Sequence, residues 1–264
     1  MQKMNLPNNL EIYYLGKEET EFIYREIFIE RQYLQHGITI NSDDCIFDIG
    51  ANIGLFSLYL SRLQQPLKIL AFEPVKPIFD VLQANVDLHS LNNTISLHNY
   101  GLGSENISKT VFTFYPNMAG NSTTRPQEKL EQREIMKAAL DRDIVARLFQ
   151  SQEITGEIKT LSSVINSSAI ESINLLKIDV EGEEYEVLRG IARNDWSKIK
   201  QIVLEVHDIE DRINRVKSLL ESQKFQVIVK HNNLVPSTLK IFNLYAVRNV
   251  SRLKNSEECS NSSG

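Results

Sequence analysis

A glycine turn between an apolar run and a helical pattern constrains the fold of this chain more than any other feature. The run Cys45-Ile-Phe-Asp48 leads into Ile49-Gly-Ala-Asn-Ile-Gly54, and Leu55-Phe-Ser-Leu-Tyr-Leu60 then begins a helical pattern. A second apolar run, Ile69-Leu-Ala-Phe72, ends in Glu73, nineteen residues after Gly54. A strand, a glycine turn, a helix and a second strand that ends in an acid are typical of the first unit of a doubly wound α/β sheet with a nucleotide-type ligand.

The turn itself has the pattern Gly-x-Asn-x-Gly and lacks the longer glycine pattern that lays a pyrophosphate over a helix N-terminus. Glycine lets the backbone approach a ligand where a Cβ atom would collide with it. An acid in the position of Glu73 can accept hydrogen bonds from both hydroxyls of a ribose. The turn therefore indicates a cofactor with a ribose and no pyrophosphate, such as S-adenosylmethionine. The alternative is an ordinary strand–helix turn without a ligand, and the position of Glu73 argues against it.

Strands and helices alternate from residue 45 onward, which predicts an α/β fold with a mostly parallel sheet and helices on both faces. We expect residues 1–17 to lead in loosely. We expect strands near residues 45–49, 68–73, 94–99, 174–179, 201–206, 225–230 and 242–247. We expect helices over residues 18–36, 53–63, 77–89, 182–193 and 209–222.

The interval 105–173, between the third and fourth predicted strands, is too long for a structureless loop. Its pattern predicts strands at 110–114 and 158–161, a polar loop over 116–126 and a helix over 127–149. Ligands of such folds bind outside the carboxyl ends of the strands, so this insertion can cover the site as a lid. The expected organisation is a helical extension (1–40), a main domain with this insertion (41–250) and a polar tail (251–264).

Four motifs follow one another along the chain: Asp48-Ile-Gly-Ala-Asn-Ile-Gly54, Phe72-Glu-Pro74, Leu176-Lys-Ile-Asp-Val-Glu-Gly-Glu-Glu184 and Leu204-Glu-Val-His207. Together they resemble the motifs of the FkbM family of S-adenosylmethionine-dependent methyltransferases, from about Glu18 to Val247. The third motif is the most specific of the four. The segment from Glu19 to Ile38 further resembles members associated with polyketide and nonribosomal peptide synthesis. The resemblance implies a Rossmann-like class I methyltransferase with a seven-stranded sheet whose last strand is antiparallel.

The resemblance also implies how the cofactor is held. Asp48 either receives the ammonium of the methionine moiety or braces the turn, and Glu73 binds the ribose. Gly101 follows the third strand, where methyltransferases often contact the adenine, although a glycine there is also compatible with a plain turn. The expected cofactor-binding residues are Asp48, Gly50, Asn52, Gly54, Glu73, Gly101 and Asp179.

Acids and a histidine end the fourth and fifth predicted strands. Glu205 and His207 alternate along a strand and therefore share one face. A histidine at this edge can take a proton from a hydroxyl near neutral pH, or it can serve only to hydrogen-bond a carboxylate. Glu183 and Glu184 can simply complement a helix dipole. The expected catalytic residues are His207, Asp179 and Glu205, and the residues expected to contact substrate or close over it are Asn121, Ser122 and Glu181.

A metal site is an alternative that the sequence does not favour. Asp179, Glu205 and Asp208 offer oxygen ligands to Mg²⁺, which would lower the pKa of a bound hydroxyl. Carboxylates are common at strand ends, however, and the chain has no closed Cys/His zinc spacing. We therefore predict no metal ligands.

Composition excludes several classes of partner. The net charge of −5 and the isoelectric point near 5.7 give no general attraction to nucleic acid or to an acidic membrane. No apolar run approaches the ~20 residues of a membrane helix, and no signal sequence is visible. Cys45 and Cys259 do not form a disulfide framework, which favours a reducing cytoplasm.

These observations predict methyl transfer from S-adenosylmethionine to an acceptor oxygen. By resemblance, the acceptor is a hydroxyl of a polyketide or nonribosomal peptide intermediate, either a free small molecule or one bound to a carrier protein beside neighbouring synthase domains. A sugar hydroxyl of a glycan or glycolipid is an alternative acceptor. A noncatalytic S-adenosylmethionine-binding scaffold is an alternative of another class. A dehydrogenase is a third, against which the missing third glycine argues.

Overall fold

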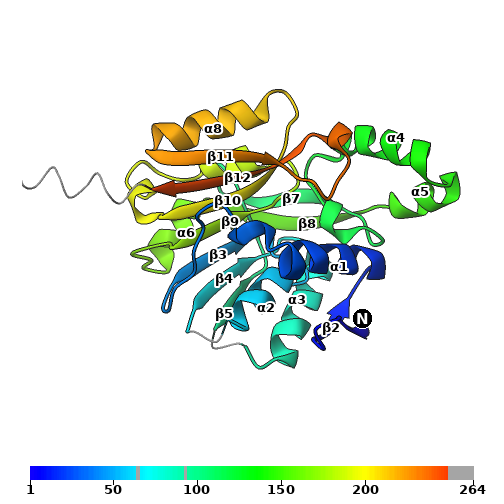
Figure 1. Ribbon diagram of the computed structural model, residues 1–264, viewed down its shortest axis with the longest axis horizontal. Coiled ribbons are helices and arrows are strands. Elements are labelled where there is room, and N and C mark those ends of the chain that lie inside the picture. The colour runs from blue at the N-terminus through cyan, green and yellow to red at the C-terminus, as the bar shows by residue number, and fades with distance from the viewer. Residues whose placement is uncertain (64–65, 92–93, 249–264) are drawn as a thin grey trace, which may run out of the picture.

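A seven-stranded sheet forms the centre of the computed structural model, which describes residues 1–63, 66–91 and 94–248 (Figure 1). Its strand order is β11-β12-β10-β9-β3-β4-β5, and β12 is antiparallel to both neighbours while all other pairs are parallel. The strands are β3 (Cys45–Ile49), β4 (Lys68–Phe72), β5 (Ile95–His98), β9 (Leu175–Ile178), β10 (Gln201–His207), β11 (Phe225–His231) and β12 (Ile241–Arg248). The predicted seven strands and the antiparallel last strand are confirmed. The polar tail, with Cys259, lies outside the described residues.

Helices cover both faces of this sheet, as the alternation predicts. Ile46 and Ile69 point to one face and pack with residues of α1, α2 and α3. Phe47 and Leu70 point to the other face and pack with α6, α7 and α8. The helices are α1 (Lys17–Tyr24), α2 (Leu55–Ser61), α3 (Lys76–Leu88), α6 (Leu161–Ser167), α7 (Glu184–Arg189) and α8 (Arg212–Ser222). Among the described helices, none is both long and apolar enough to cross a membrane.

The N-terminal segment differs from the expectation. Residues 1–17 are not a loose lead-in, because β1 (Gln2–Asn5) and β2 (Glu11–Tyr14) form an antiparallel pair. A single helix over 18–36 is also wrong: α1 passes into a π-helix at Arg25–Ile29, and the chain then turns through Arg31, whose φ is 50°. A 3₁₀ turn, Gln32–Leu34, follows.

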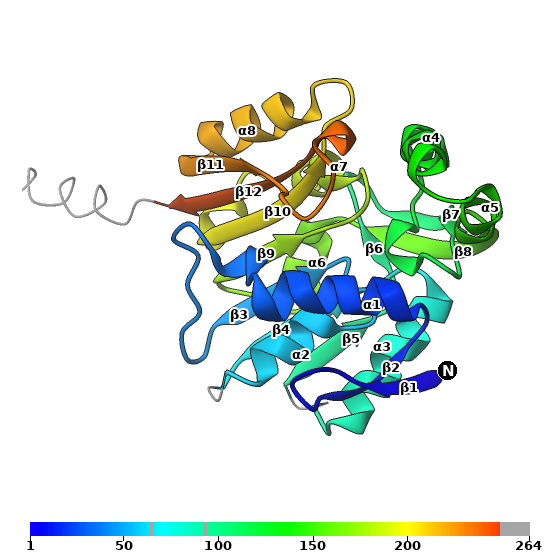
Figure 2. The ribbon, with the colours of Figure 1, turned by 45° about the vertical axis from the view of Figure 1, so that its right-hand side comes forward.

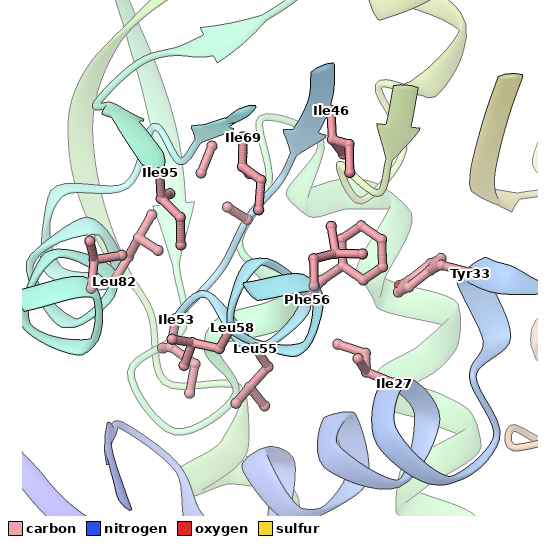
Figure 3. Close-up of a cluster of buried hydrophobic side chains, with 14 of the residues drawn as sticks. Ile27, Tyr33, Ile46, Ile53, Leu55, Phe56, Leu58, Ile69, Leu82 and Ile95 are labelled. Carbon is pink, nitrogen blue, oxygen red and sulfur yellow. The ribbon is translucent and has the colours of Figure 1, made fainter. Parts of the chain in front are cut away.

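Packing explains why this broken helix is stable. Figure 3 shows Ile27 and Tyr33 beside Phe56 of α2, within the apolar cluster on one face of the sheet. The rings of Tyr33 and Phe56 meet edge to face, with centroids 5.3 Å apart. The π-helix and the left-handed turn at Arg31 thus place Ile27, before the turn, and Tyr33, after it, against the same face of the sheet.

The insertion forms a second, three-stranded sheet in the order β6-β8-β7. β6 (Gly101–Leu102) comes just before the insertion, whose own elements in this region are β7 (Ile107–Phe114), α4 (Lys129–Ala139), α5 (Arg142–Leu148) and β8 (Gln152–Lys159). The single helix expected over 127–149 is wrong, because Asp141 is extended and caps α5 by accepting a hydrogen bond from the Asp143 amide at 2.8 Å. Figure 2 shows α4 and α5 standing beside the main sheet, on the same side as the start of α1.

Candidate active site

A cavity of about 710 Å³ lies at the carboxyl ends of the central strands. Its wall comes from α1 and the π-helix, the glycine turn, the end of β4, the insertion, and the ends of β9 and β10. It brings together ten of the predicted site residues: Gly50, Asn52, Glu73, Gly101, Asn121, Ser122, Asp179, Glu181, Glu205 and His207. Asp48 and Gly54 are not part of the wall.

The glycine turn is shaped by the neighbouring strand. Gly50 has φ of 74°, and a Cβ atom on it would lie 1.7 Å from the backbone oxygen of Asp179. The packing of the turn against the end of β9 therefore requires glycine here, and Gly50 also lies on the cavity wall, where we expected it to contact the cofactor. Lys177 fixes the turn from beneath, because its Nζ donates to the Gly50 oxygen at 2.8 Å.

Asp48 lies below this turn and is fully buried. It accepts a hydrogen bond from the Ser57 hydroxyl at 2.8 Å, and its Oδ1 is 3.3 Å from Lys177 Nζ. The ammonium beside Asp48 is therefore that of Lys177, a group of the protein itself. Of the two roles that the sequence left open for Asp48, bracing the turn is the one this geometry favours.

Glu73 is 6% exposed at the end of β4 and is held by backbone donors. Its Oε2 accepts from the Asn52 amide at 3.1 Å, and its Oε1 accepts from the Val75 amide at 2.9 Å. Burial raises the pKa of Glu73 to about 7, although these two amides oppose the shift. Each oxygen keeps a lone pair for a further donor from the cavity.

His207 and Glu205 share one face of β10, as predicted. His207 Nε2 is 3.3 Å from Glu181 Oε2 and 3.5 Å from Glu205 Oε1, but neither contact has the alignment of a hydrogen bond. Burial and the Lys129 ammonium lower the pKa of His207, but the carboxylates of Glu181 and Glu205 outweigh them and leave that pKa above its ordinary value. Both acids approach the ring through Nε2.

Glu181 links this histidine to the insertion. Its φ is 53°, and its carboxylate forms a short ion pair with Lys129 of α4, which is 3% exposed. The Thr123 hydroxyl donates to the Glu181 backbone oxygen at 2.8 Å. The insertion therefore contributes a buried cation to the site.

Further ion pairs fasten the insertion to the main sheet. Arg125 donates to both oxygens of Glu183, at 2.8 and 3.1 Å. Arg212 of α8 donates to both oxygens of Glu128, at 2.8 and 2.9 Å. Glu183 therefore does more than complement a helix dipole, whereas Glu184 stays beside its helix start and accepts from the Gly182 amide at 2.7 Å. Paired forks of this kind fix the orientation of both partners.

The predicted loop over residues 116–126 contacts the N-terminal helix. Asn121 ends a 3₁₀ turn, and Ser122 accepts a hydrogen bond from the Tyr115 amide at 3.4 Å. Glu19 of α1 accepts from the Ala119 amide at 3.0 Å and the Gly120 amide at 2.7 Å. Burial raises the pKa of Glu19 to about 7, against the effect of these two amides.

Sequence reasoning missed several polar residues of the cavity, among them Glu19, Glu26, Tyr33 and Asn232. The Tyr33 hydroxyl donates to Asp179 Oδ2 at 2.8 Å. A signal existed for the two acids, because Glu19 and Glu26 are seven residues apart and therefore lie on the same face of a helix as Phe22. No local pattern marks Asn232.

A metal site finds no support in the arrangement of these side chains. Within the described ranges, no group of three or more His, Cys, Asp and Glu residues could hold a metal ion. Asp208, a candidate ligand, instead accepts a hydrogen bond from the Ile213 amide at 3.1 Å, at the start of α8.

Comparison with known proteins agrees with this architecture. Residues 48–227 match the family model described as the methyltransferase FkbM domain. The chain is 37% identical over 253 residues to Methyltransferase 1 of Beauveria bassiana, covering 94% of this chain and 99% of that protein. It is 34% identical over 248 residues to 31-O-demethyl-FK506 methyltransferase FkbM of Streptomyces tacrolimicus, covering 90% and 94%.

A solved structure shares the fold at low sequence identity. The crystal structure of methyltransferase FkbM from Methylobacillus flagellatus superposes with a TM-score of 0.54 at 15% identity, covering 81% of this chain and 46% of that one. The fold, the match to residues 48–227 and the similarity to both relatives lead to one assignment: the chain belongs to the FkbM methyltransferase family.

Proposed function

We propose that this protein is an S-adenosylmethionine-dependent O-methyltransferase that acts on a hydroxyl of a lipophilic polyketide or nonribosomal peptide intermediate. The observation that carries the proposal is one cavity with Glu73 at one end and His207 at the other. When bound, S-adenosylmethionine would supply the methyl group as an electrophile on a sulfonium sulfur. The protein then has to align the acceptor, exclude water and remove the hydroxyl proton.

The residues at the glycine turn fit this cofactor. The cavity volume of about 710 Å³ is in the range of small-molecule and cofactor sites. The two free lone pairs on Glu73 suit the two ribose hydroxyls. Near Glu73 the wall carries apolar side chains, which suit an adenine ring; they belong to Pro74, Val75, Leu102, Phe112 and Ile158.

His207 is the group that we assign to the proton. Its ring faces two carboxylates through Nε2, which orients it and favours its protonated form. The ring then takes the proton that the acceptor hydroxyl loses as its oxygen bonds to the methyl carbon. Asp179 lies between the glycine turn and this base, fixed by the Tyr33 hydroxyl, and borders the path between the two ends of the cavity.

The outer wall of the cavity favours a lipophilic acceptor. Phe22 on α1 is 39% exposed, and Ile144 on α5 is 42% exposed. Met136 and Leu148 complete this rim. Apolar side chains that remain exposed around an opening are typical of a surface that binds an apolar partner. The name of the relative from Streptomyces tacrolimicus, 31-O-demethyl-FK506 methyltransferase, supports an oxygen as the atom that is methylated.

The test uses S-adenosylmethionine with a labelled methyl group and two acceptors, a macrolactone with a free secondary hydroxyl and a hexuronic acid glycoside. We expect calorimetry to detect cofactor binding and label to appear on the macrolactone as a methyl ether. Transfer to the glycoside alone would overturn the assignment of the acceptor. Cofactor binding without transfer to either acceptor would favour a scaffold, and binding of NADH instead would favour a dehydrogenase.

A further inference from the structure

We propose that Asn232 and Glu26 are positioning residues that hold Glu205 against His207. Neither was expected from the sequence, and they lie at opposite ends of the chain. The inference rests on the proposed function in so far as it treats His207 as the base. The claim that Asn232 and Glu26 hold the Glu205 carboxylate in place does not depend on the proposed function.

The orientation of the Asn232 amide is fixed by a backbone donor. The Leu234 amide donates to Asn232 Oδ1 at 3.0 Å, so the nitrogen, Nδ2, must point the other way. The Asn232 main chain is itself held, because its amide donates to the Ile241 oxygen at 2.9 Å. The side chain belongs to a residue that is 2% exposed and has no room to turn.

The amide nitrogen of Asn232 bridges two carboxyl groups. Nδ2 donates to Glu205 Oε2 at 2.9 Å and to Glu26 Oε1 at 3.3 Å. With Oε2 of Glu205 engaged, the remaining oxygen, Oε1, faces His207 Nε2 at 3.5 Å. Rotation of the Glu205 carboxylate away from the histidine would break the bond to Asn232.

Glu26 reaches this amide because of the π-helix. The Glu30 amide donates to the Arg25 oxygen at 2.9 Å, a five-residue step that widens the turn containing Glu26. Glu26 is 6% exposed and forms no ion pair among the described residues. π-Helical turns are rare and occur often at functional sites, which agrees with a role in the cavity.

Two carboxyl groups on one buried amide cannot both carry charge at low cost. Burial raises the pKa of Glu26 well above its usual range, and the charges of Glu205 and Asp179 raise it further against the effect of Lys177. The raised pKa favours the protonated form of Glu26 beside the amide that it shares with Glu205. A neutral Glu26 allows a charged Glu205 to face the histidine.

Other charged groups lie near His207 and near Glu26, and they also contribute to the pH dependence of methyl transfer. Around His207 they are Glu181, Glu184 of α7, Lys129 of α4 and Arg212 of α8, which donates to the His207 backbone oxygen. Around Glu26 they are Asp179, Lys177, Tyr33 and Tyr245 of β12. None of them contacts the Asn232 amide, so a change at Asn232 alters the placement of Glu205 first.

The test compares Asn232→Ala with Asn85→Ala. Asn85 is also a buried asparagine that holds the N-terminal segment, through hydrogen bonds to Tyr13, and it does not line the cavity. The readouts are the pKa of His207, from a nuclear magnetic resonance titration of its ring, and the pH profile of methyl transfer. A purely structural role for Asn232 predicts that both variants lose stability and that neither moves the histidine pKa.

We expect Asn232→Ala to lower the pKa of His207, because Glu205 is no longer held beside it. Methyl transfer should fall by about tenfold or more, with the acid limb of the profile moved to lower pH. Asn85→Ala also removes a hydrogen bond to the Ile53 oxygen of the glycine turn, and it should leave the His207 pKa and the pH of the acid limb at the wild-type values. A His207 pKa that is the same in Asn232→Ala and wild type overturns the inference.

Glu26→Gln keeps the test decisive if Asn232→Ala does not fold. Glutamine copies a protonated carboxyl, so we expect the His207 pKa to stay near its wild-type value. A lower pKa in Glu26→Gln would mean that Glu26 is charged and would overturn its assigned role. The titration of the His207 ring can be measured without any methyl transfer. If the pKa values shift as expected but no methyl transfer is found, the positioning role of Asn232 stands and only the proposed function is contradicted.

Discussion

The two ends of the cavity are built in different ways. The polar contacts of Glu73 are local, because both of its carboxylate oxygens accept from nearby backbone amides, those of Asn52 and Val75, and residues of β6, β7 and β8 add only apolar side chains to this end. The end near His207 combines side chains from the π-helix, α4, the loop after β9, β10 and the loop after β11. The first end therefore depends on local conformation, and the second depends on the packing of distant segments.

The difference extends to electrostatics. Glu73 has no cation within ion-pair distance among the described residues, and its pKa is set first by burial and two amides, with smaller and opposed contributions from the charges of Lys177 and Asp48. His207 responds to at least three charged side chains, from Glu181, Glu205 and Lys129. Substitutions near Glu73 should accordingly change cofactor binding, and substitutions near His207 should change the rate of methyl transfer.

The substitution His207→Ala is the most decisive test of this difference between the two ends of the cavity. We expect methyl transfer to fall by about 10²–10⁴-fold with cofactor affinity nearly intact, because a general base contributes in this range. His89→Ala, on a residue whose ring contacts the Glu11 backbone outside the cavity, is the matched control. Loss of activity with a chelator and its recovery with Mg²⁺ would instead favour metal catalysis.

Glu73→Ala tests the cofactor end. A hydrogen bond to a buried charged group contributes about 1.5–3 kcal/mol, so cofactor affinity measured by calorimetry should fall by roughly 10- to 150-fold. Glu73→Gln, which keeps one acceptor oxygen, should lose less. An unchanged dissociation constant in a folded Glu73→Ala protein would remove Glu73 from the ribose site.

Hydrogen exchange tests whether the loop over residues 116–126 belongs to the cofactor end. We expect its amides to become protected when cofactor and acceptor bind, because the loop lies on the cavity wall and a Cβ atom on Gly120 would lie only 3.3 Å from Asn52 Nδ2 of the glycine turn. Glu19→Gln should weaken this protection by about tenfold, since it replaces a charged acceptor with a neutral one. Equal exchange with and without ligands would argue against a closing loop.

The smallest effect concerns pH and stability. Burial raises the pKa of Glu19, Glu73 and Glu184 to about 7, so each binds its proton more tightly when the protein is folded. The stabilisation is complete below about pH 4.5 and is lost as the pH rises through about 7.

The melting temperature of the ligand-free protein should therefore rise between pH 8 and pH 6, by about 2–4 °C for each kcal/mol gained. Glu19→Gln and Glu73→Gln should flatten this slope, because each removes one of the titrating groups. A melting temperature that falls between pH 8 and pH 6 would contradict the assignment.

The same division explains what could be predicted from the sequence. The glycine turn, Glu73 and the seven strands follow from local patterns of apolar residues, glycine and acids. The face shared by Glu205 and His207 follows from strand alternation alone. Glu26 was missed because a regular helix over 18–36 gives no reason for a π-turn at Arg25–Ile29, which is stabilised by packing against α2.

Contacts between distant segments also give some residues roles that the sequence did not indicate. Gly50 looked like an opening for a ligand, yet it accommodates the backbone of Asp179, which is far away in the sequence. Glu183 looked like a helix-start acid, and Arg125 of the insertion turns it into an anchor. Sequence patterns cannot reveal such partners, because the pairing depends on tertiary structure.

The amide bridge between Glu26 and Asn232 has a consequence for how the protein is made. Asn232 follows Glu26 by 206 residues, so a ribosome that adds about 5–20 residues per second delivers it roughly 10–40 s later. Until then the carboxyl of Glu26 would be buried without a donor, at a cost of about 1–3 kcal/mol. We expect the N-terminal segment to stay undocked on the nascent chain, with Tyr24 and Ile27 accessible to chaperones, until the last strands leave the ribosome.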